Sequence, residues 1–372
     1  MNRKNNILVI HLEFSKWKSA KSWSYQTQLG LFDGFKSEKY KIHHLLNPFG
    51  GERYRRRFGS HVMAYVKNKK FDQVWMEIVH TNYDQDFLSF IFELAPVRVA
   101  MLGESIYYTE EEIRFAPVLR NRSSKIQNLT KYFTHALCID EADSESLKSP
   151  NLEAIWWVPA MPKTQQTIDA INRSSAIFSG PSYGNRASFL NDEELKLHVE
   201  HLVALENDTQ YPLLFDITQL VFKSSLFFPA AINSKLGDIY AGTIHNTRSI
   251  LFDYWIEGLK RGVAVVQLPH FVKAFPGRIY EGMAAGRPVI TPMLKDRPRA
   301  MQLFTPNEEI LYYGNKPSEI VALVEKLNSD RKYAEEVASN ALAKVQRLHN
   351  TQRRTEQILR WIENNIEPNY YD

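Results

Sequence analysis

Short apolar segments alternate with amphipathic segments along most of the chain. The apolar segments have the length of β-strands, and the amphipathic ones repeat their apolar positions with the period of an α-helix. The pattern predicts strands at 6–12, 41–46, 73–79, 97–102, 136–139, 154–157, 175–179, 213–217, 225–228, 263–268 and 287–292. It predicts helices at 23–36, 59–69, 86–93, 125–132, 192–206, 247–260, 318–327, 331–348 and 352–364. This alternation is typical of an α/β protein with largely parallel sheets.

The alternation pauses at residues 160–172, where a proline-containing turn is followed by a polar segment. A chain of 372 residues also exceeds the usual size of one domain. We therefore expect two doubly wound, Rossmann-like domains, over residues 1–165 and 172–350, facing a central cleft. In such folds ligands bind outside the carboxyl ends of the strands, so the loops that follow strands are the first places to look for a site.

Composition narrows the class of protein only a little. The formal charge of +4 permits acidic ligands, and with no recognised nucleic-acid-binding module it counts against nucleic acid as a partner. The single cysteine, Cys138, excludes an intrachain disulfide and a cysteine-based zinc cluster. The apolar run near the N-terminus is too short for a signal peptide, so we expect a cytoplasmic protein.

The most informative segment is Arg278–Thr291. It predicts a short helix with Glu281 in its first turn, ended by Gly286 and followed directly by a strand. The helix dipole disfavours a cation such as Arg278 at the N-terminus unless an anion binds there. A carboxylate beside it can accept two neighbouring sugar hydroxyls, so the pair suggests a nucleotide-sugar site. The alternative is an amphipathic helix in which Arg278 and Glu281 pair with each other.

A second segment, residues 175–186, reads as a strand that opens into a glycine-containing loop. Gly180 and Gly184 would let the backbone turn sharply and bring its amides close to an anion. Arg186 could neutralise a phosphate at the start of the helix that follows. The segment matches neither a Walker A loop nor a dinucleotide-binding fingerprint. Ordinary turn chemistry is the alternative explanation of its glycines.

A third segment, the loop of residues 267–278, carries three potential cations or donors. They are His270, Lys273 and Arg278. A solvated basic loop is the alternative to a binding role for His270 and Lys273.

These three segments, in this order and spacing, resemble the nucleotide-binding half of GT-B glycosyltransferases. They are most similar to the group 1 transferases and their spore-maturation-type relatives. The resemblance covers about residues 174–362 and rests mainly on the Arg278–Thr291 motif, whereas the first half matches only in architecture. It implies a transferase that uses a nucleoside-diphosphate sugar, and a C-terminal helix, within 351–372, that crosses back to the first domain.

The resemblance also assigns residue roles. Glu281 would hold the ribose, and the backbone amides of Gly282 and Met283 would face the diphosphate, with Arg278 and Arg186 as cationic partners. The family often has an acid eight residues before the ribose glutamate, whereas this chain has a lysine there.

That lysine, Lys273, could stabilise charge on the leaving diphosphate or could mark a degenerate enzyme. It also leaves the retaining mechanism of many relatives in question here. GT-B enzymes generally use fixed positive groups, so we expect no metal and no cofactor. The Asp84-Gln-Asp86 triplet is interpreted as a helix cap rather than a metal site.

The first domain should supply the acceptor site and any general base. The candidates are acids and histidines that directly follow predicted strands: Glu13, His80, Glu104 and Asp140. His80 and Glu104 rank first because each follows a strongly apolar strand, although a structural cap would explain either one. A base must also reach the acceptor hydroxyl, which a sequence does not reveal.

The acceptor itself is open. The basic run Arg53–Arg57 suggests an acidic glycan or a lipid-linked phosphate, with peripheral contact to a membrane, while a solvated basic face is the alternative. The leading hypothesis is a glycosyltransferase of polysaccharide biosynthesis. The alternative is a non-catalytic nucleotide-sugar or glycan-binding protein that retains the GT-B fold.

Overall fold

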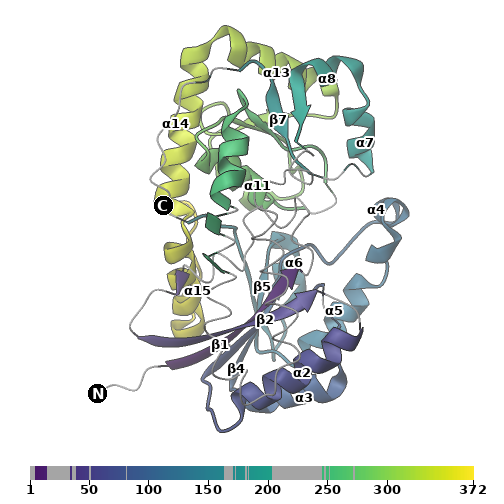
Figure 1. Ribbon diagram of the computed structural model, residues 1–372, viewed down its shortest axis with the longest axis vertical. Coiled ribbons are helices and arrows are strands. Elements are labelled where there is room, and N and C mark those ends of the chain that lie inside the picture. Colours follow the sequence, from purple (N-terminus) through teal and green to yellow (C-terminus); the bar gives the residue numbers. More distant parts are fainter. Residues whose placement is uncertain are drawn as a thin grey trace.

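The computed structural model of the chain describes residues 5–14, 34–35, 39–49, 52–80, 82–162, 171, 173–180, 182, 184–202, 245–246, 249–250, 252–270 and 273–372, without the side chains of 12–14, 46–49, 52–57, 61, 115 and 118. These residues form two parallel β-sheets with flanking helices. The first sheet lies in the lower half of Figure 1 and the second in the upper half.

Six strands form the first sheet, and every pair of neighbours is parallel. In sheet order they are β2 (Tyr40–Phe49), β1 (Asn5–Phe14), β3 (Gln73–Glu77), β4 (Val97–Leu102), β5 (His135–Cys138) and β6 (Glu153–Trp156). The helices of this half are α2 (Glu52–Val66), α3 (Gln85–Leu94), α4 (Glu110–Phe115), α5 (Arg122–Thr130) and α6 (Glu141–Leu147). The sheet grows in opposite directions from β1 and β3, so these two strands mark its topological switch point.

Five described strands form the second sheet, again all parallel. In sheet order they are β11 (Leu311–Tyr313), β10 (Val289–Pro292), β9 (Val265–Val266), β7 (Ala176–Phe178) and β8 (Val199–His201). Its helices are α7 (Asn185–Leu190), α8 (Glu193–His198), α11 (Gly277–Ala284), α12 (Pro298–Met301), α13 (Pro317–Ser329) and α14 (Arg331–Leu348), and residues 252–260 are helical as well. The order reverses between β7 and β9, which places the switch point of this sheet there.

Both faces of the first sheet are covered, as expected for parallel strands. On β1, Leu8 and Ile10 pack into a core that also contains residues of α2, α3 and α5. The alternate residues Ile7 and Val9 face the other way, where Ile358 of α15 (Thr351–Asn364) joins them. The chain therefore returns from the second sheet to the first through α14 and α15, along the left side of Figure 1.

The second sheet is layered in the same way. Val265 of β9 packs with α11 and the helix at 252–260, whereas Val266 packs with α13 on the opposite face. The first of these cores also takes in Trp156 and Val158, which end β6 and begin the connection between the sheets. The hydrophobic core of the second half thus extends into the connecting segment.

The structure confirms the predicted parallel α/β organisation, and it contains all six strands predicted before residue 160. Some predictions were wrong in detail. The helix expected over 192–206 ends at His198, because Val199–His201 instead pairs with β7 at the edge of the second sheet. The helix of the motif begins at Gly277, so Glu281 lies in its second turn rather than its first. The strands predicted at 213–217 and 225–228 lie outside the described residues, as does the helix predicted at 23–36 except for residues 34–35.

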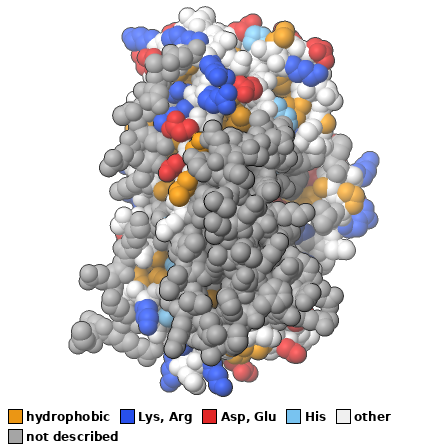
Figure 2. Space-filling view, in the orientation of Figure 1, with side chains coloured by type: hydrophobic (Ala, Val, Ile, Leu, Met, Phe, Trp, Pro, Cys, Tyr) orange, Lys and Arg blue, Asp and Glu red, His pale blue; other side chains and the backbone are white. Residues whose placement is uncertain are grey.

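Charged side chains of both signs are intermixed on the described surface at the top of Figure 2, in the region of α13 and α14. Among the helices that the structure describes, none combines the length and apolar character needed to cross a membrane.

Candidate functional site

Two arginines from different segments converge on the backbone that follows β7. A Cβ atom built on Gly180 would lie 3.2 Å from Nη1 of Arg186 and 3.3 Å from Nη1 of Arg278. Gly180 has a φ of +156°, a conformation that side chains disfavour. Both arginines come from segments that follow β7 or β9, the strands on either side of the switch point. Two guanidinium groups therefore meet where a doubly wound sheet binds its ligand.

The loop after β9 holds both cations in place. Arg186, a buried residue of α7, donates from Nε to the carbonyl of Pro269 at 2.9 Å. Arg278, the second residue of α11, donates from Nη1 to Gln267 Oε1 at 3.3 Å. The Gln267 backbone carbonyl in turn accepts from the Tyr313 hydroxyl at 2.9 Å. Residues of the loop after β9 thus hold Arg186 and Arg278, the predicted cationic partners, close to each other.

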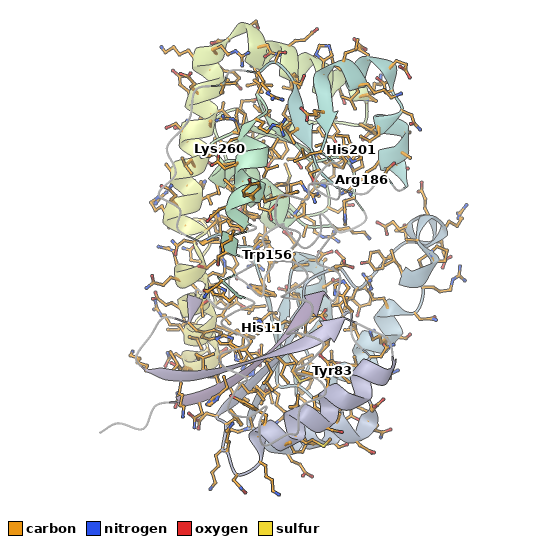
Figure 3. All side chains as sticks on the ribbon, viewed as in Figure 1. His11, Tyr83, Trp156, Arg186, His201 and Lys260 are labelled. Atoms are coloured by element: carbon orange, nitrogen blue, oxygen red, sulfur yellow. The ribbon has the colours of Figure 1, made fainter. Side chains whose placement is uncertain are left out.

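The loop after β7 is tied down from the neighbouring strand. His201, the last residue of β8, lies with Nε2 2.7 Å from the carbonyl oxygen of Gly180. Figure 3 shows His201 and Arg186 close together on this half of the molecule. Gly184 has a φ of +54° at the start of α7, a backbone conformation that explains a glycine there. His270, the remaining donor predicted for this region, is half-buried one residue after Pro269.

The predicted ribose ligand, Glu281, is a buried carboxylate in α11. It is 1% exposed, and its Oε2 accepts a hydrogen bond from the indole Nε1 of Trp255 at 2.9 Å. Trp255 belongs to the helix at 252–260 and is itself buried. The indole fixes the orientation of the carboxylate one turn after Arg278.

The next two residues of α11 have packing roles. A Cβ on Gly282 would lie 2.9 Å from Val265 Cβ and 2.9 Å from Val289 Cγ2, so only a glycine lets the helix sit this close to β9 and β10. Met283 is fully buried in the same core. Both residues follow the first turn of the helix, where unbonded amides occur. The diphosphate contacts that the resemblance implies for their amides stay a prediction.

In the first half, the two top-ranked candidates contact one another directly. His80 Nε2 lies 3.1 Å from Glu104 Oε1, and His80 Nδ1 lies 2.8 Å from Glu77 Oε1. Arg122 of α5 contacts the other oxygen of Glu104 and also donates to the Tyr108 hydroxyl at 3.1 Å. Glu77, His80, Glu104 and Arg122 form a chain of alternating charges at the carboxyl ends of β3 and β4, which we name the first-edge network.

The charges in this network set its protonation. Burial would lower the pKa of His80, but hydrogen bonds and charges of Glu104 and Glu77 raise it to about 9. Burial would raise the pKa of Glu104, but His80 and Arg122 lower it to about 2. His80 is therefore an imidazolium at neutral pH. In this state it can donate a proton but cannot accept one, which argues against the general-base role expected from the sequence.

The third predicted catalytic residue, Lys273, contacts the first half of the molecule. Its Nζ lies 3.1 Å from Glu112 Oε2 of α4. Close by, Asp140 caps the N-terminus of α6 and accepts a hydrogen bond from Arg297 Nε at 2.5 Å, so its carboxylate forms a contact between the two halves. Burial, with the negative charge of Asp140, raises the pKa of the nearby Asp143 carboxyl to about 7.

Several residues of the site carry no signal in the sequence. Glu77 ends a buried strand, and Arg122 and Trp255 lie on helices far along the chain from the residues they contact. Candidates were chosen because they directly follow a predicted strand. Glu77 lies inside the strand predicted at 73–79, and Arg122 and Trp255 lie on helices, so this rule did not select them. Among other candidates, the side chain of Glu13 and those of Arg53–Arg57 lie outside the described part. Asp84 occupies the N-cap position of α3.

Within the described residues, acids, histidines and cysteine do not cluster as metal ligands would. The expectation that the protein needs no metal and no cofactor stays a prediction.

Two doubly wound sheets with paired arginines at a switch point define the class as a two-domain, Rossmann-like α/β protein. Several solved structures have a similar fold. A sucrose-phosphate synthase from Thermosynechococcus elongatus superposes with a TM-score of 0.55 at 10% identity, over 97% of this chain and 99% of that one. HepE from Anabaena, solved with UDP-glucose, gives 0.53 at 12% identity, over 96% and 99%. A glycosyltransferase from Rickettsia africae gives 0.51 at 10% identity, over 98% and 100%.

In sequence, residues 252–360 match the family model described as glycosyl transferase-like. No curated protein matches the chain. The matched residues include α11, Lys273 and Arg278, so the family match covers this part of the site, whereas Gly180 and Arg186 precede it. The predicted GT-B fold is confirmed by these structures.

Proposed function

We propose that this chain is a glycosyltransferase that binds a nucleoside-diphosphate sugar at the carboxyl edge of the second sheet. The convergence of Arg186 and Arg278 on Gly180 carries the proposal. Guanidinium groups bind phosphate oxygens with two parallel hydrogen bonds, and two of them match the charge of a diphosphate. The glycosyl transferase-like sequence of residues 252–360 and the GT-B fold support the same reaction class.

In this proposal the Glu281 carboxylate accepts hydrogen bonds from the two ribose hydroxyls. Its carboxylate is oriented by Trp255 and lies one turn after Arg278, so a ribose bound there would have its phosphates directed toward the arginines. A carboxylate held by a neighbouring donor is preorganised for such a ligand.

The reaction transfers the sugar to an acceptor hydroxyl of a glycan or a lipid-linked molecule. The bond from the anomeric carbon to the phosphate oxygen breaks, a bond to the acceptor oxygen forms, and the acceptor proton passes to a base. Arg186 and Arg278 stabilise the charge that develops on the leaving diphosphate. His80, as an imidazolium at the edge of the first sheet, is placed to donate to a substrate oxygen rather than to serve as that base.

The first test is binding of the intact protein to UDP, GDP, ADP, CMP and dTDP at millimolar concentration, read by thermal shift. A ligand that binds only the folded state raises the melting temperature. UDP is the first to try because HepE, which shares the fold, was solved with UDP-glucose. No shift with any nucleotide would overturn the donor site.

Arg278→Ala then localises the site. Loss of a charged hydrogen bond of about 1.5–3 kcal/mol predicts a dissociation constant for the nucleoside diphosphate that rises about tenfold or more, with a smaller loss for the nucleoside alone. Arg261→Ala, an exposed arginine of the same half, is the matched control and should bind as the parent does. Equal losses for nucleotide and nucleoside would argue against a phosphate contact.

A non-catalytic nucleotide-sugar-binding protein is the second candidate, and the engagement of Lys273 by Glu112 favours it. Turnover of the bound nucleotide sugar distinguishes a transferase from a binding protein. Release of free nucleoside diphosphate from the bound nucleotide sugar supports the transferase, and tight binding without release supports the binder.

A further inference from the structure

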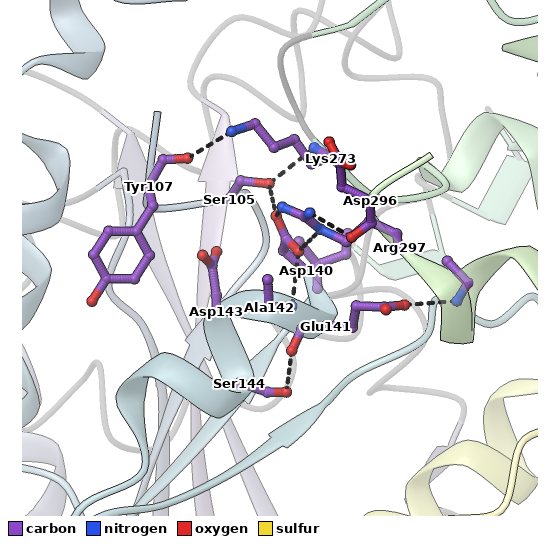
Figure 4. A network of polar contacts seen from close by, with 12 residues as sticks. Ser105, Tyr107, Asp140, Glu141, Ala142, Asp143, Ser144, Lys273, Asp296 and Arg297 are labelled. Carbon is purple, nitrogen blue, oxygen red and sulfur yellow. Dashed lines mark hydrogen bonds and ion pairs between the residues drawn. The ribbon is translucent and has the colours of Figure 1, made fainter. Parts of the chain in front are cut away.

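Lys273 precedes α11 in the second half of the molecule, yet the first half supplies its described contacts. Its backbone N–H donates to Ser105 Oγ at 3.0 Å, and its Nζ lies 3.1 Å from Glu112 Oε2. The same Nζ is 3.4 Å from the carbonyl oxygen of Tyr107. All three partners follow β4 at the carboxyl edge of the first sheet. Figure 4 shows Lys273 reaching across to Ser105 and Tyr107.

Ser105 is a buried link between this contact and a second one. Its hydroxyl accepts from Lys273 and donates to Asp140 Oδ2 at 2.8 Å, so both of its hydrogen-bonding roles are used. Asp140 also accepts from Arg297, from Nε at 2.5 Å and from Nη2 at 3.1 Å. Ser105 and Asp140 are fully buried. A continuous chain therefore runs from Lys273 through Ser105 and Asp140 to Arg297, from the second half to the first and back.

The next acid of α6 makes a parallel bridge. Glu141 accepts from the backbone amides of Arg299 at 3.1 Å and Ala300 at 2.7 Å. These amides lie in the first turn of α12, where backbone donors lack partners within the helix. Figure 4 places Glu141 beside Asp140, facing the second half. Asp140 and Glu141, adjacent acids of the first half, thus accept hydrogen bonds from a side chain and from the backbone of the second half.

We propose that Lys273 is a docking cation: Ser105 and Glu112 hold it against the first half and thereby fix the segment that leads into α11. Only three residues separate Lys273 from the start of that helix, whose second residue is Arg278. The position of Arg278 is then coupled to the placement of the first half. The consequence for ligand binding rests on the proposed donor site, whereas the docking itself does not.

Geometry distinguishes this role from the electrophilic one. A lysine that stabilises a leaving phosphate must present its ammonium group to that phosphate, but here the group is directed to the carboxylate of Glu112. The side chains of Lys273 and Glu112 are 27% and 24% exposed, so the ion pair by itself contributes modestly. The partly buried hydrogen bond to Ser105 should contribute more, because its loss leaves the amide of Lys273 without that acceptor.

Hydrogen exchange of the peptide spanning residues 273–276, measured in the full-length protein without ligand, tests the docking. Ser105→Ala should raise its exchange about five- to tenfold, the equivalent of one lost hydrogen bond. The matched control is Ser144→Ala, whose hydroxyl bonds to Glu141 O within the first half and does not reach the second. Unchanged exchange in Ser105→Ala, or an equal rise in Ser144→Ala, overturns the proposal.

A second pair of variants keeps the test decisive if Ser105→Ala does not fold. Glu112→Gln removes the charge but preserves the capping interaction with the Thr109 amide, and Lys273→Met removes the ammonium while keeping the stem. Docking predicts that each raises exchange of residues 273–276 and that the double variant is no worse than Lys273→Met alone. Glu111→Gln, an exposed neighbouring acid, is the control. If the effects of Glu112→Gln and Lys273→Met on exchange add, the two residues do not act as a pair, and the proposal is overturned.

The same variants separate this inference from the proposed function. Nucleotide binding with unaltered exchange refutes the docking and leaves the donor site standing. Altered exchange in a protein that binds no nucleotide supports the docking and refutes the donor site. If both hold, Ser105→Ala should also raise the dissociation constant for the nucleotide, since Arg278 is no longer fixed.

Discussion

The carboxyl edges of the two sheets carry their charges in opposite ways. On the first, Glu77, His80, Glu104 and Arg122 alternate in sign and each contacts the next. On the second, Arg186 and Arg278 bring like charges to one glycine. Alternating charges in contact stabilise each other, whereas two cations held close together attract an anion.

Because of this difference, we expect the charges of the first edge to contribute mainly to stability and those of the second edge to ligand binding. A charge removed from the first-edge network should lower the free energy of unfolding, because its former partners are left partly buried. A cation removed from the second edge should chiefly lower the affinity for an anionic ligand. The two edges can therefore be told apart by which quantity changes.

The largest effect should come from Glu104→Gln. The change removes the negative charge between His80 and Arg122, and we expect the free energy of unfolding to fall by about 3 kcal/mol. Glu110→Gln is the control, since its ion pair with Arg120 is long, at 3.9 Å, and exposed. It should alter stability by less than about 0.5 kcal/mol. Denaturant unfolding compares the two, and equal effects would mean that the first-edge network does not stabilise the fold.

The next effect is a pH dependence that arises from His80. Its pKa is raised to about 9 in the folded protein, above the value near 6.5 of a free histidine. The folded state therefore binds more protons between these values, and the extra stability, present below pH 6.5, is lost as the pH rises through 9. We expect it to amount to about 2 kcal/mol, after allowance for partial exposure.

His80→Gln should flatten that part of the stability curve. His198→Gln, at a half-buried histidine of α8 outside the first-edge network, is the matched control against which the slope is compared. Unfolding free energies at pH 6, 7, 8 and 9 give the slope for each protein. A slope that persists in His80→Gln would place the titrating group elsewhere.

The contrast between the edges also shows what a sequence can predict. His80 and Glu104 could be found because a polar residue directly after an apolar strand lies at the edge where ligands bind. Arg186 and Arg278 could be found because glycines and a helix start accompany them. Both rules use only local order along the chain.

The partners that determine what these residues do are set by tertiary contacts. Glu77 is a strand residue in every local pattern, yet it helps to hold His80 in its charged form. Glu112 and Lys273 are 161 positions apart, as their residue numbers show, and meet only because the two halves pack together. These tertiary contacts favour the charged form of His80 and join Lys273 to the first half.

The smallest expected effect is the difference in stability between two alanine substitutions, one at a glycine from each edge. Gly103 directly follows β4, and a Cβ built on it meets nothing within 4 Å, so Gly103→Ala should change stability by less than about 0.5 kcal/mol. Gly180 follows β7 with a φ of +156°, and a Cβ there would come within 3.2 Å of Arg186 and 3.3 Å of Arg278. Gly180→Ala should cost about 1–2 kcal/mol in backbone strain.

Gly180→Ala should also weaken binding of the nucleoside diphosphate, because the added methyl displaces both guanidinium groups from where they converge. Thermal unfolding with and without the nucleotide measures both quantities on the same samples. If Gly103→Ala and Gly180→Ala lose stability equally and bind the nucleotide equally well, the second edge is not the anion site. A loss of binding in Gly180→Ala alone, larger than its loss of stability explains, would locate the phosphates at the two arginines.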